Sequence, residues 1–411
     1  MKQLKYDLVL IGATGFTGKL VAEYLAKEYG VKNENFVWAI AGRSQNKLND
    51  LKIFLKDIDP EAEDLPALLA DSYDRSSLDR ITSVTRVIIS AVGPYLKYGK
   101  KLVESCASNG ADYCDLTGEV PFIRESIDSY NTIAQDNNCR IIHSCGFDSI
   151  PSDIGVLMLQ KEAIKRYGKP FNRVRLYARS MKGGLSGGTI ASMIKISDYV
   201  RSQTRTSGCR NPHALNPDPQ IFKGVDEPSL RSVKWDKDMN LWIYPFIMSG
   251  INTRIVRRSN ALMNFLYGRS FRYSEVSSHS KGFFGYFRSI LMLFILALLR
   301  ISIRFKTSLW FLKKFILPKP GQGPNREKRE NGFFRLLLVG ASNGNKITLS
   351  VTGNKDPGYA ATARMITESA LSLILNRDFL PKASGVLTPA AGIGKVLVDR
   401  LKNRGITFKL E

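Results

Sequence analysis

Three glycines spaced three residues apart lie near the start of the chain, between an apolar run and a helix-forming run. Residues 8–11 predict a buried parallel strand. Gly12 permits a tight turn, Gly15 lets the backbone approach phosphate oxygens, and Gly18 lets the following helix pack on the strand. Free amides at the helix start attract an anion, so the motif predicts a dinucleotide pyrophosphate site, with an ordinary glycine-rich turn as the alternative. The residues predicted to contact the nucleotide here are Gly12, Ala13, Thr14, Gly15, Phe16, Thr17 and Gly18.

The second apolar run, residues 36–41, is followed by Gly42-Arg43-Ser44 and has no acidic residue at its tip. An Asp or Glu at this place bonds the free 2′-hydroxyl of NAD, whereas an arginine pairs with the 2′-phosphate of NADP. Arg43 and Ser44 therefore predict NADP(H) as the cofactor. The alternative is a surface arginine that contacts no ligand.

The fourth predicted strand, residues 86–92, runs into Val92-Gly93-Pro94-Tyr95. In a nucleotide-binding parallel sheet this carboxyl edge lies beside the nicotinamide. Gly93 is predicted to let the backbone approach the ring, with Val92 and Pro94 as its neighbours. Tyr95 is a candidate catalytic residue that faces the substrate and donates a proton. A rigid turn with a packing tyrosine is the alternative.

Acidic residues follow the next two predicted strands. Asp115 and Glu119 could serve as acid, base or ribose ligand, or equally as helix caps. Asp148 lies in Cys145-Gly-Phe-Asp-Ser-Ile-Pro-Ser-Asp, where the chain crosses into a second domain, and is a second candidate catalytic residue; a cap of the following helix is its alternative. Cys145 is not predicted to be a nucleophile, because His143 has no third group to orient it.

Such residues need a sheet that brings its carboxyl edges together. Strands are predicted near residues 7–12, 36–41, 66–70, 86–92, 112–116 and 140–144, with helices between them. The predicted fold class is α/β: a Rossmann doubly wound parallel sheet over residues 1–150, then a second mixed α/β domain with a basic apolar insert. Helices within about 357–402 are expected to complete the first domain.

The second domain is predicted over residues 151–356. It begins with a helix at 152–167, a strand at 173–179 and a glycine-rich bend at 183–188, and long irregular loops follow at 205–240. Segments 333–341 and 346–352 alternate apolar and polar residues around Ser342-Asn-Gly-Asn, which is typical of a β-hairpin. Helices at 360–375 and 392–402 are predicted near the end of the chain.

The basic apolar insert, residues 254–330, carries sixteen Lys and Arg against three acids, which is +13 of the net charge of +23. Arg288 and Arg300 bracket eleven uncharged residues, fewer than the ~20 that span a bilayer. On a helical wheel over 283–317, basic residues take about half the circumference and apolar residues the rest. The pattern is typical of a helix lying in a membrane interface. The alternatives are a buried core helix and an apolar face covered by a second copy in a homodimer.

Composition argues against several other classes of protein. The five cysteines show no Cys-x-x-Cys spacing and the three histidines are scattered, so neither a metal site nor a disulfide framework is predicted. No signal peptide precedes the first strand, which predicts a cytoplasmic protein that touches a membrane only at its periphery. Nucleic acid is not predicted as a partner, because no aromatic platform or binding module accompanies the charge.

Motifs along nearly the whole chain, in order, resemble the saccharopine dehydrogenase-like oxidoreductase family, although residues 205–330 carry few of them. The motifs are Gly12-Ala-Thr-Gly-Phe-Thr-Gly, Ala41-Gly-Arg-Ser, Val92-Gly-Pro-Tyr, Tyr98-Gly, Asp115-Leu-Thr-Gly-Glu, Cys145-Gly-Phe-Asp-Ser-Ile-Pro-Ser-Asp, Gly187-Gly-Thr and Gly385-Val-Leu-Thr-Pro-Ala. The chain looks similar to the branch with the trans-acting enoyl reductases of polyketide lipid synthesis and the eukaryotic saccharopine dehydrogenase-like oxidoreductases. The resemblance implies an NADP-binding Rossmann domain interrupted by a mixed α/β domain. No set of substrate arginines matches that of true saccharopine dehydrogenases.

The resemblance and the insert together favour an NADP(H)-dependent oxidoreductase of the enoyl reductase type. Its substrate would be a lipid or polyketide acyl chain with an activated double bond, and the cofactor would carry the chemistry. One alternative is a carbonyl or imine reductase, with Tyr95 as proton donor; another is a non-catalytic NADP-binding membrane adaptor. None of the sixteen tyrosines has a lysine four residues later, so the catalytic pair of short-chain dehydrogenases is absent.

Overall fold

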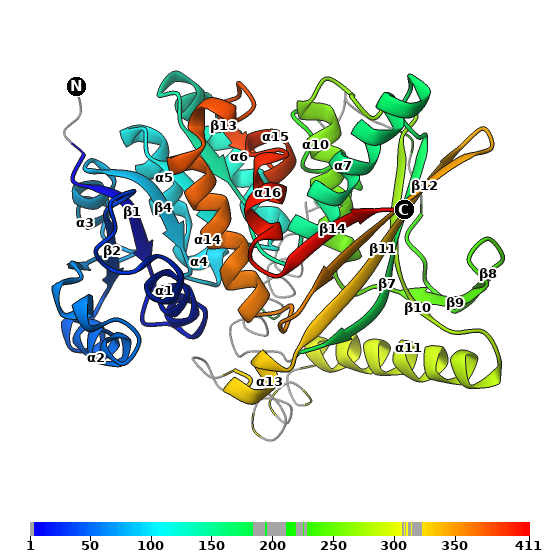
Figure 1. The fold of residues 1–411 in the computed structure, drawn as a ribbon, viewed down its shortest axis with the longest axis horizontal. Helices are drawn as coiled ribbons and strands as arrows, with labels where there is room; N and C mark the ends of the chain where they lie inside the picture. Colours follow the sequence, from blue (N-terminus) through cyan, green and yellow to red (C-terminus); the bar gives the residue numbers. More distant parts are fainter. Residues whose placement is uncertain are drawn as a thin grey trace. The chain divides into compact units, whose positions relative to one another are not determined.

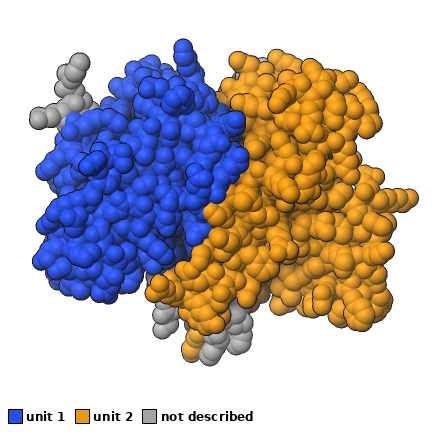
Figure 2. All heavy atoms as spheres, in the orientation of Figure 1, with its two compact units in different colours: residues 1–150, 358–404 blue, residues 151–357, 405–411 orange. Residues whose placement is uncertain are grey.

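The structure is a computed structural model that describes residues 4–183, 211–218, 228–305 and 323–411, together with residues 194, 225, 308, 310 and 314. The chain divides into two compact units (Figure 2). The first contains Met1–Ile150 and Gly358–Arg404, and the second contains Pro151–Pro357 and Gly405–Glu411. The first unit is therefore assembled from two separate stretches of sequence.

A seven-stranded parallel sheet forms the centre of the first unit, with the strand order β13-β6-β5-β4-β1-β2-β3 (Figure 1). The strands are β1 (Tyr6–Ile11), β2 (Trp38–Gly42), β3 (Ala67–Leu69), β4 (Thr85–Ser90), β5 (Asp112–Asp115), β6 (Arg140–Ile142) and β13 (Gly385–Leu387). The six expected strands and the doubly wound sheet are confirmed, whereas β13 was not expected. The strand order reverses between β1 and β4, which is where sheets of this kind bind ligands.

Helices precede and follow these strands along the chain. They are α1 (Phe16–Tyr29), α2 (Gln45–Lys56), η1 (Pro60–Asp64), α3 (Arg75–Thr82), α4 (Tyr95–Tyr98), α5 (Lys100–Asn109), α6 (Val120–Asp136), α14 (Ala360–Leu375), η2 (Arg377–Phe379), α15 (Pro389–Gly392) and α16 (Val396–Lys402). The helix expected at 392–402 is instead two, because Gly394 has a φ of +68° and interrupts the helical backbone.

A buried carboxylate joins the late helix α14 to the first helix of the chain. Glu368 accepts hydrogen bonds from the hydroxyls of Tyr24, at 2.8 Å, and Tyr29, at 2.6 Å. Its other oxygen lies 2.8 Å from Nε of Arg400 on α16. Burying a charge is costly unless it is paired and hydrogen-bonded, and Glu368 has both kinds of partner. These contacts hold residues far apart in sequence within one unit.

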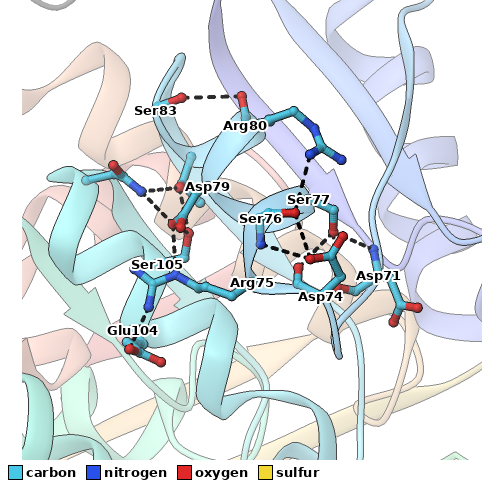
Figure 3. A network of polar contacts seen from close by, with 12 residues as sticks. Asp71, Asp74, Arg75, Ser76, Ser77, Asp79, Arg80, Ser83, Glu104 and Ser105 are labelled. Atoms are coloured by element: carbon cyan, nitrogen blue, oxygen red, sulfur yellow. Dashed lines mark hydrogen bonds and ion pairs between the residues drawn. The ribbon is translucent and has the colours of Figure 1, made fainter.

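A second polar network holds α3 against α5 (Figure 3). The guanidinium of Arg75 lies 2.8 Å from a carboxylate oxygen of Asp79 and 2.6 Å from one of Glu104. Ser105 on α5 donates a hydrogen bond of 2.6 Å to Asp79. At the start of α3, Asp74 accepts a bond from the amide of Ser76 and so caps the helix. The network therefore serves the packing of the two helices.

The second unit contains a mixed seven-stranded sheet with the order β14-β12-β11-β7-β10-β9-β8. Only β7 and β10 pair in parallel; the other neighbours are antiparallel. The strands are β7 (Arg173–Lys182), β8 (Lys234–Asp236), β9 (Leu241–Pro245), β10 (Arg272–His279), β11 (Phe333–Ser342), β12 (Asn345–Gly353) and β14 (Ile406–Leu410). Its helices are α7 (Ile150–Tyr167), α10 (Ser249–Leu262), α11 (Phe283–Arg304) and α13 (Arg326–Glu330).

The predicted hairpin is present as β11 and β12. Asn343 and Gly344 form its two-residue turn with φ angles of +50° and +79°, both in the left-handed region that such a turn requires. The bend expected at 183–188 lies outside the described residues apart from Gly183, and so does much of the expected loop region 205–240.

The insert differs from the expected single helix over 283–317. Helix α11 ends at Arg304, and Phe305 has an extended backbone with φ −106° and ψ 131°. The expected helix therefore does not continue unbroken past Arg304, and most of the expected segment 306–317, including Lys306 and Lys313, lies outside the described residues. Helix α11 lies along β9 and β10, yet most of its described side chains are exposed, which excludes the buried core helix. Among the described residues, no helix combines the length and the apolar character needed to cross a bilayer.

Candidate functional site

The first glycine of the motif is required by both its backbone angle and its surroundings. Gly12 has a φ of +86°, and its amide donates a 2.9 Å hydrogen bond to the carbonyl of Ala41 at the end of β2. A Cβ at this position would lie 2.6 Å from Cγ2 of Val92, in the segment after β4. Any side chain would clash there. Gly12 thus brings the ends of β1, β2 and β4 together at the point where the strand order reverses.

The other two glycines define where a ligand can approach. Gly15 is the N-cap of α1 and carries no capping side chain. A Cβ there would meet only the carbonyl oxygen of Gly12, at 3.3 Å, so the space above the helix start is open. By contrast, a Cβ on Gly18 would lie 2.1 Å from that same oxygen, so Gly18 is where the helix packs on the turn. An open helix N-terminus that only a glycine leaves clear fits a pyrophosphate.

The remaining motif residues surround this opening in different ways. Ala13 is buried, Thr14 is exposed and Thr17 is half-buried. The ring of Phe16 packs edge-to-face on Tyr359, with the ring centroids 5.1 Å apart. Ala13 and Phe16 therefore contribute packing, while Thr14 and Thr17 have side chains that solvent, or a ligand, can reach.

Arg43 and Ser44 follow β2 at the same edge of the sheet. The Arg43 side chain is exposed. The hydroxyl of Ser44 accepts a hydrogen bond from the amide of Lys47, at 3.4 Å, and caps α2. Ser44 is thus held in place as a cap, and its hydroxyl proton remains able to donate to a phosphate oxygen. The nucleotide-binding role of both residues stays a prediction.

Three residues that were not predicted to bind the nucleotide, Tyr73, Lys97 and Tyr98, contact one another, and Tyr98 lies close enough to Arg43 to feel its charge. The rings of Tyr73 and Tyr98 contact each other edge-to-face, with their centroids 5.4 Å apart. A hydrogen bond from Lys97 lowers the pKa of the Tyr98 hydroxyl, and the positive charge of Arg43 acts in the same direction. Hydrogen bonds with Tyr98 and Tyr73 raise the pKa of Lys97. The position of Tyr73 just after the third strand is the signal that could have identified it.

The segment that follows β4 packs against the glycine turn. The side chain of Val92 occupies the space beside Gly12, and Gly93 and Pro94 are joined by a cis peptide bond. Pro94 is the N-cap of the short helix α4, which begins at Tyr95. These residues lie at the carboxyl end of β4, as expected. Their contact with a nicotinamide stays a prediction.

The hydroxyl of Tyr95 makes two hydrogen bonds with the backbone, one as donor and one as acceptor. The hydroxyl donates to the carbonyl of Ser90 at 3.1 Å and accepts from the amide of Leu116 at 3.3 Å. Glu119 accepts hydrogen bonds from the amides of Tyr95 and Leu96, at 3.0 and 2.8 Å, and so caps α4. Burial raises the pKa of Tyr95 well above its usual value. These contacts favour a positioning role for Tyr95 and the cap role for Glu119.

Asp115 is the centre of a buried hydrogen-bond network. One of its oxygens lies 2.8 Å from Nδ1 of His143, and the other accepts from the amides of Thr117, at 3.0 Å, and Ser144, at 3.2 Å. The other imidazole nitrogen, Nε2, lies 2.9 Å from the hydroxyl of Ser126. Acid, imidazole and hydroxyl are all at most 1 % exposed. The three side chains therefore join β5, β6 and α6 and cannot reach a substrate.

Asp148 differs from every other acid in this region. It follows β6, and among the described residues no group donates a hydrogen bond to its carboxyl. Desolvation by the atoms packed around it raises the pKa of Asp148 to about 6, although the residue keeps partial exposure. Its charge also acts on Tyr95 in the site. A carboxyl with a raised pKa stays protonated to a higher pH than an ordinary aspartate, and with no hydrogen bond from the described residues it is suited to donate its proton.

Comparison with known proteins agrees with this geometry. Residues 8–142 match the family model described as the saccharopine dehydrogenase NADP binding domain. The chain is 38% identical to a putative trans-acting enoyl reductase of Mycobacterium tuberculosis, over 98% of this chain and 97% of that protein. It is 36% identical to the trans-acting enoyl reductase of Mycobacterium bovis, with the same coverage of each chain.

A solved structure shares the fold at much lower sequence identity. The apo saccharopine dehydrogenase (L-Glu forming) of Saccharomyces cerevisiae matches with a TM-score of 0.53 and 14% identity, over 99% of each chain. At that identity the likeness concerns the fold alone. The NADP-binding domain of the first unit and the full-length relatives together show an NADP-dependent oxidoreductase. The chain belongs to the saccharopine dehydrogenase-like oxidoreductases, in the branch of the trans-acting enoyl reductases.

Proposed function

We propose that this protein reduces an activated carbon–carbon double bond of a lipid or polyketide acyl substrate with NADPH. The observation that carries the proposal is Asp148 at the edge of the nucleotide-binding sheet: its carboxyl accepts no hydrogen bond from the residues that the structure describes, and its pKa is raised to about 6. The full-length similarity to proteins named trans-acting enoyl reductases supports the reaction type.

The proposed reaction divides between the cofactor and the chain. When bound, NADPH supplies a hydride to the β-carbon of the double bond. Gly15 leaves room for the pyrophosphate, and Arg43 with Ser44 would hold the 2′-phosphate. The protonated carboxyl of Asp148 then donates its proton to the α-carbon, and solvent would return a proton to it because the residue is only partly buried. Tyr95 positions this edge of the sheet through its two backbone bonds.

The proposal places the enzyme in the cytoplasm, in peripheral contact with a lipid surface. A long acyl substrate partitions into lipid, and the basic apolar insert supplies a surface suited to reach it. The carbonyl or imine reductase of the alternative would use Tyr95 as donor. That hydroxyl already donates its proton to one backbone group and accepts a hydrogen bond from another. It is therefore a poor proton donor to a substrate, which favours the enoyl reaction.

A labelling experiment tests the reaction directly. Purified protein would be incubated with 4-deuterated NADPH and α,β-unsaturated acyl thioesters of short and long chains. We expect one deuterium at the β-carbon of a saturated product, detected by mass spectrometry, with higher turnover on longer chains. A β-ketoacyl thioester serves as the control for carbonyl reduction. Deuterium found only in the product of the β-ketoacyl thioester would show that the protein is a carbonyl reductase. Binding of NADPH without turnover of either thioester would show that it is a non-catalytic adaptor.

The open space at Gly15 leads to a prediction about nucleotide binding. Gly15→Val is expected to abolish binding of NADPH and of NADH, because the side chain would enter the space that the pyrophosphate needs. The fold should persist, since the one close neighbour of the new Cβ, the carbonyl oxygen of Gly12 at 3.3 Å, needs to move only slightly. Fluorescence titration measures binding, and circular dichroism checks folding.

Two matched variants define the outcome of this experiment. Gly250→Val places the same side chain on α10 in the second unit, where nothing lies within 4 Å, and should leave binding unchanged. Gly18→Val should instead lower stability, because its Cβ would lie 2.1 Å from a backbone oxygen. Native affinity for NADPH in a folded Gly15→Val protein would contradict the assigned pyrophosphate site.

A further inference from the structure

Helix α11 contacts its own unit along one face, where Gly285 and Ser289 are buried and Leu293, Leu296 and Leu299 are half-buried. A Cβ at Gly285 would lie 1.8 Å from the carbonyl oxygen of Ser280. The hydroxyl of Ser289 lies 3.0 Å from Nδ1 of His279 on β10. This face packs on β9 and β10, and the residues on the opposite face are exposed. The greater part of α11 remains without a partner among the described residues.

The side of α11 that points away from the sheet carries only apolar residues at helical spacing. We call these residues the α11 stripe: Phe284, Phe287, Leu291, Phe294, Leu298 and Ile301. The spacing alternates between three and four, which places all six on one face. Each is exposed; Phe284 reaches 79 % and Phe294 62 %. Six large apolar side chains in a row form a patch of the kind that marks a contact with a protein or a membrane. Figure 1 shows α11 along one side of the second unit.

Charge decides between these two kinds of contact. No acidic residue occurs between Glu275 and Glu327, whereas that stretch carries nine Lys and Arg. Two copies joined through their stripes would bring two such basic segments together, without acids to pair with them. An anionic lipid surface, in contrast, attracts every one of these charges. A convex single helix also needs no matching groove when its partner is fluid lipid.

Aromatic residues at the start of α11 support the same partner. The indole rings of Trp235 and Trp242 have centroids 5.0 Å apart, and Trp242 lies 4.6 Å from the ring of Tyr286. Together with Phe283 they line an apolar hollow of about 370 Å³. Trp and Tyr concentrate at membrane–water interfaces, because their rings are apolar and carry one polar group.

We propose that α11 lies in the plane of an anionic lipid membrane, with its stripe inserted among the acyl chains and the flanking basic residues at the headgroups. The inference rests on the proposed function, because a long acyl substrate makes a lipid surface the place where the enzyme works. Vesicle binding needs neither substrate nor nucleotide, so the two ideas can fail separately.

The test uses flotation of the full-length protein with vesicles of phosphatidylcholine alone and of phosphatidylcholine with phosphatidylglycerol. We expect binding to the anionic vesicles, and weaker binding to the neutral ones. The triple variant Phe287→Ser/Phe294→Ser/Leu298→Ser should bind anionic vesicles about a hundredfold more weakly, because three apolar side chains no longer insert. Arg288→Glu should weaken binding to anionic vesicles more than to neutral ones.

The matched control is Val37→Ser/Ile53→Ser/Phe379→Ser, which removes three exposed apolar residues from the first unit and should bind as the native protein does. The inference is overturned if the native protein binds neither vesicle. It is also overturned if light scattering shows a dimer that the stripe variant dissociates, since a second copy would then cover α11. Native turnover of a short, water-soluble enoyl thioester by the stripe variant would show that it is folded. If neither protein turns over that thioester, yet the native protein binds vesicles, the proposed function fails and the membrane inference stands.

Discussion

Asp148→Asn is expected to lower kcat for the reduction of an enoyl thioester by about 10²- to 10⁴-fold, the usual contribution of a general acid. Asparagine keeps the size of the side chain and has no acidic proton to transfer. Binding of NADPH should not change, because Asp148 is not among the residues assigned to the nucleotide. Stopped-flow kinetics under single-turnover conditions would separate the chemical step from product release.

The pH dependence of the same reaction is a sharper measurement than its rate. The pKa of Asp148 is raised to about 6, so the carboxyl is protonated below that pH and ionised above it. Only the protonated form donates, and kcat should therefore fall as the pH rises through about 6. Asp148→Asn should remove this dependence, while Asp148→Glu should partly restore it. Glu119→Gln serves as the control, since loss of the α4 cap should lower stability without moving the profile. An unchanged kcat and profile in Asp148→Asn would remove it as the donor.

Arg43→Asp is expected to reverse the preference between the two nicotinamide cofactors. The charge-assisted hydrogen bonds of an arginine to a 2′-phosphate contribute roughly 1.5–3 kcal/mol, so the Kd for NADPH should rise about 10- to 100-fold. The Kd for NADH should fall, because a carboxylate at this position can accept from the free 2′-hydroxyl. Titration of the native and variant proteins with both cofactors measures the change.

Two further variants locate this effect. Lys97→Ala removes a cation of the cluster with Tyr73 and Tyr98 beside Arg43, and we expect a smaller loss of NADPH affinity from it. Arg80→Asp makes the same change as Arg43→Asp at an exposed position of α3 and should affect neither cofactor. If the native protein bound NADPH and NADH equally well, Arg43 would have no role in recognising the 2′-phosphate.

Local chemistry explains why so much of the first unit could be predicted. The apolar strand β1 and the three glycines that follow it, Gly12, Gly15 and Gly18, lie within about a dozen residues of one another. The steric requirements of this motif are local and do not depend on distant parts of the chain. The same holds for the turn at Asn343 and Gly344, where two left-handed residues determine the register of the hairpin. Such signals are sufficient to predict the sheet, its carboxyl edge and the cofactor.

Long-range contacts explain what the sequence left open among the acids. Asp115, Glu119 and Asp148 follow two neighbouring strands of the sheet. The sequence favoured Asp148 as the catalytic candidate, but it left a helix cap open as the role of each acid. Only the fold shows that Asp115 is bonded to His143, that Glu119 caps α4, and that Asp148 accepts no hydrogen bond from the described part of the chain. A hydrogen bond between β5 and β6 depends on strand pairing, and periodicity contains no information about that pairing.

The insert shows the same division between local and tertiary information. Its sequence alone determined that an apolar helix without acidic residues would form. It also determined that the uncharged stretch of this helix is too short to span a bilayer. Periodicity cannot tell a face that packs on a core from one that faces outward, because both are apolar. The tertiary structure decided this point: Gly285 and Ser289 take the contact with the sheet, and Phe287, Phe294 and Leu298 remain exposed. It also ended the helix at Arg304, a boundary that the uninterrupted apolar pattern did not contain.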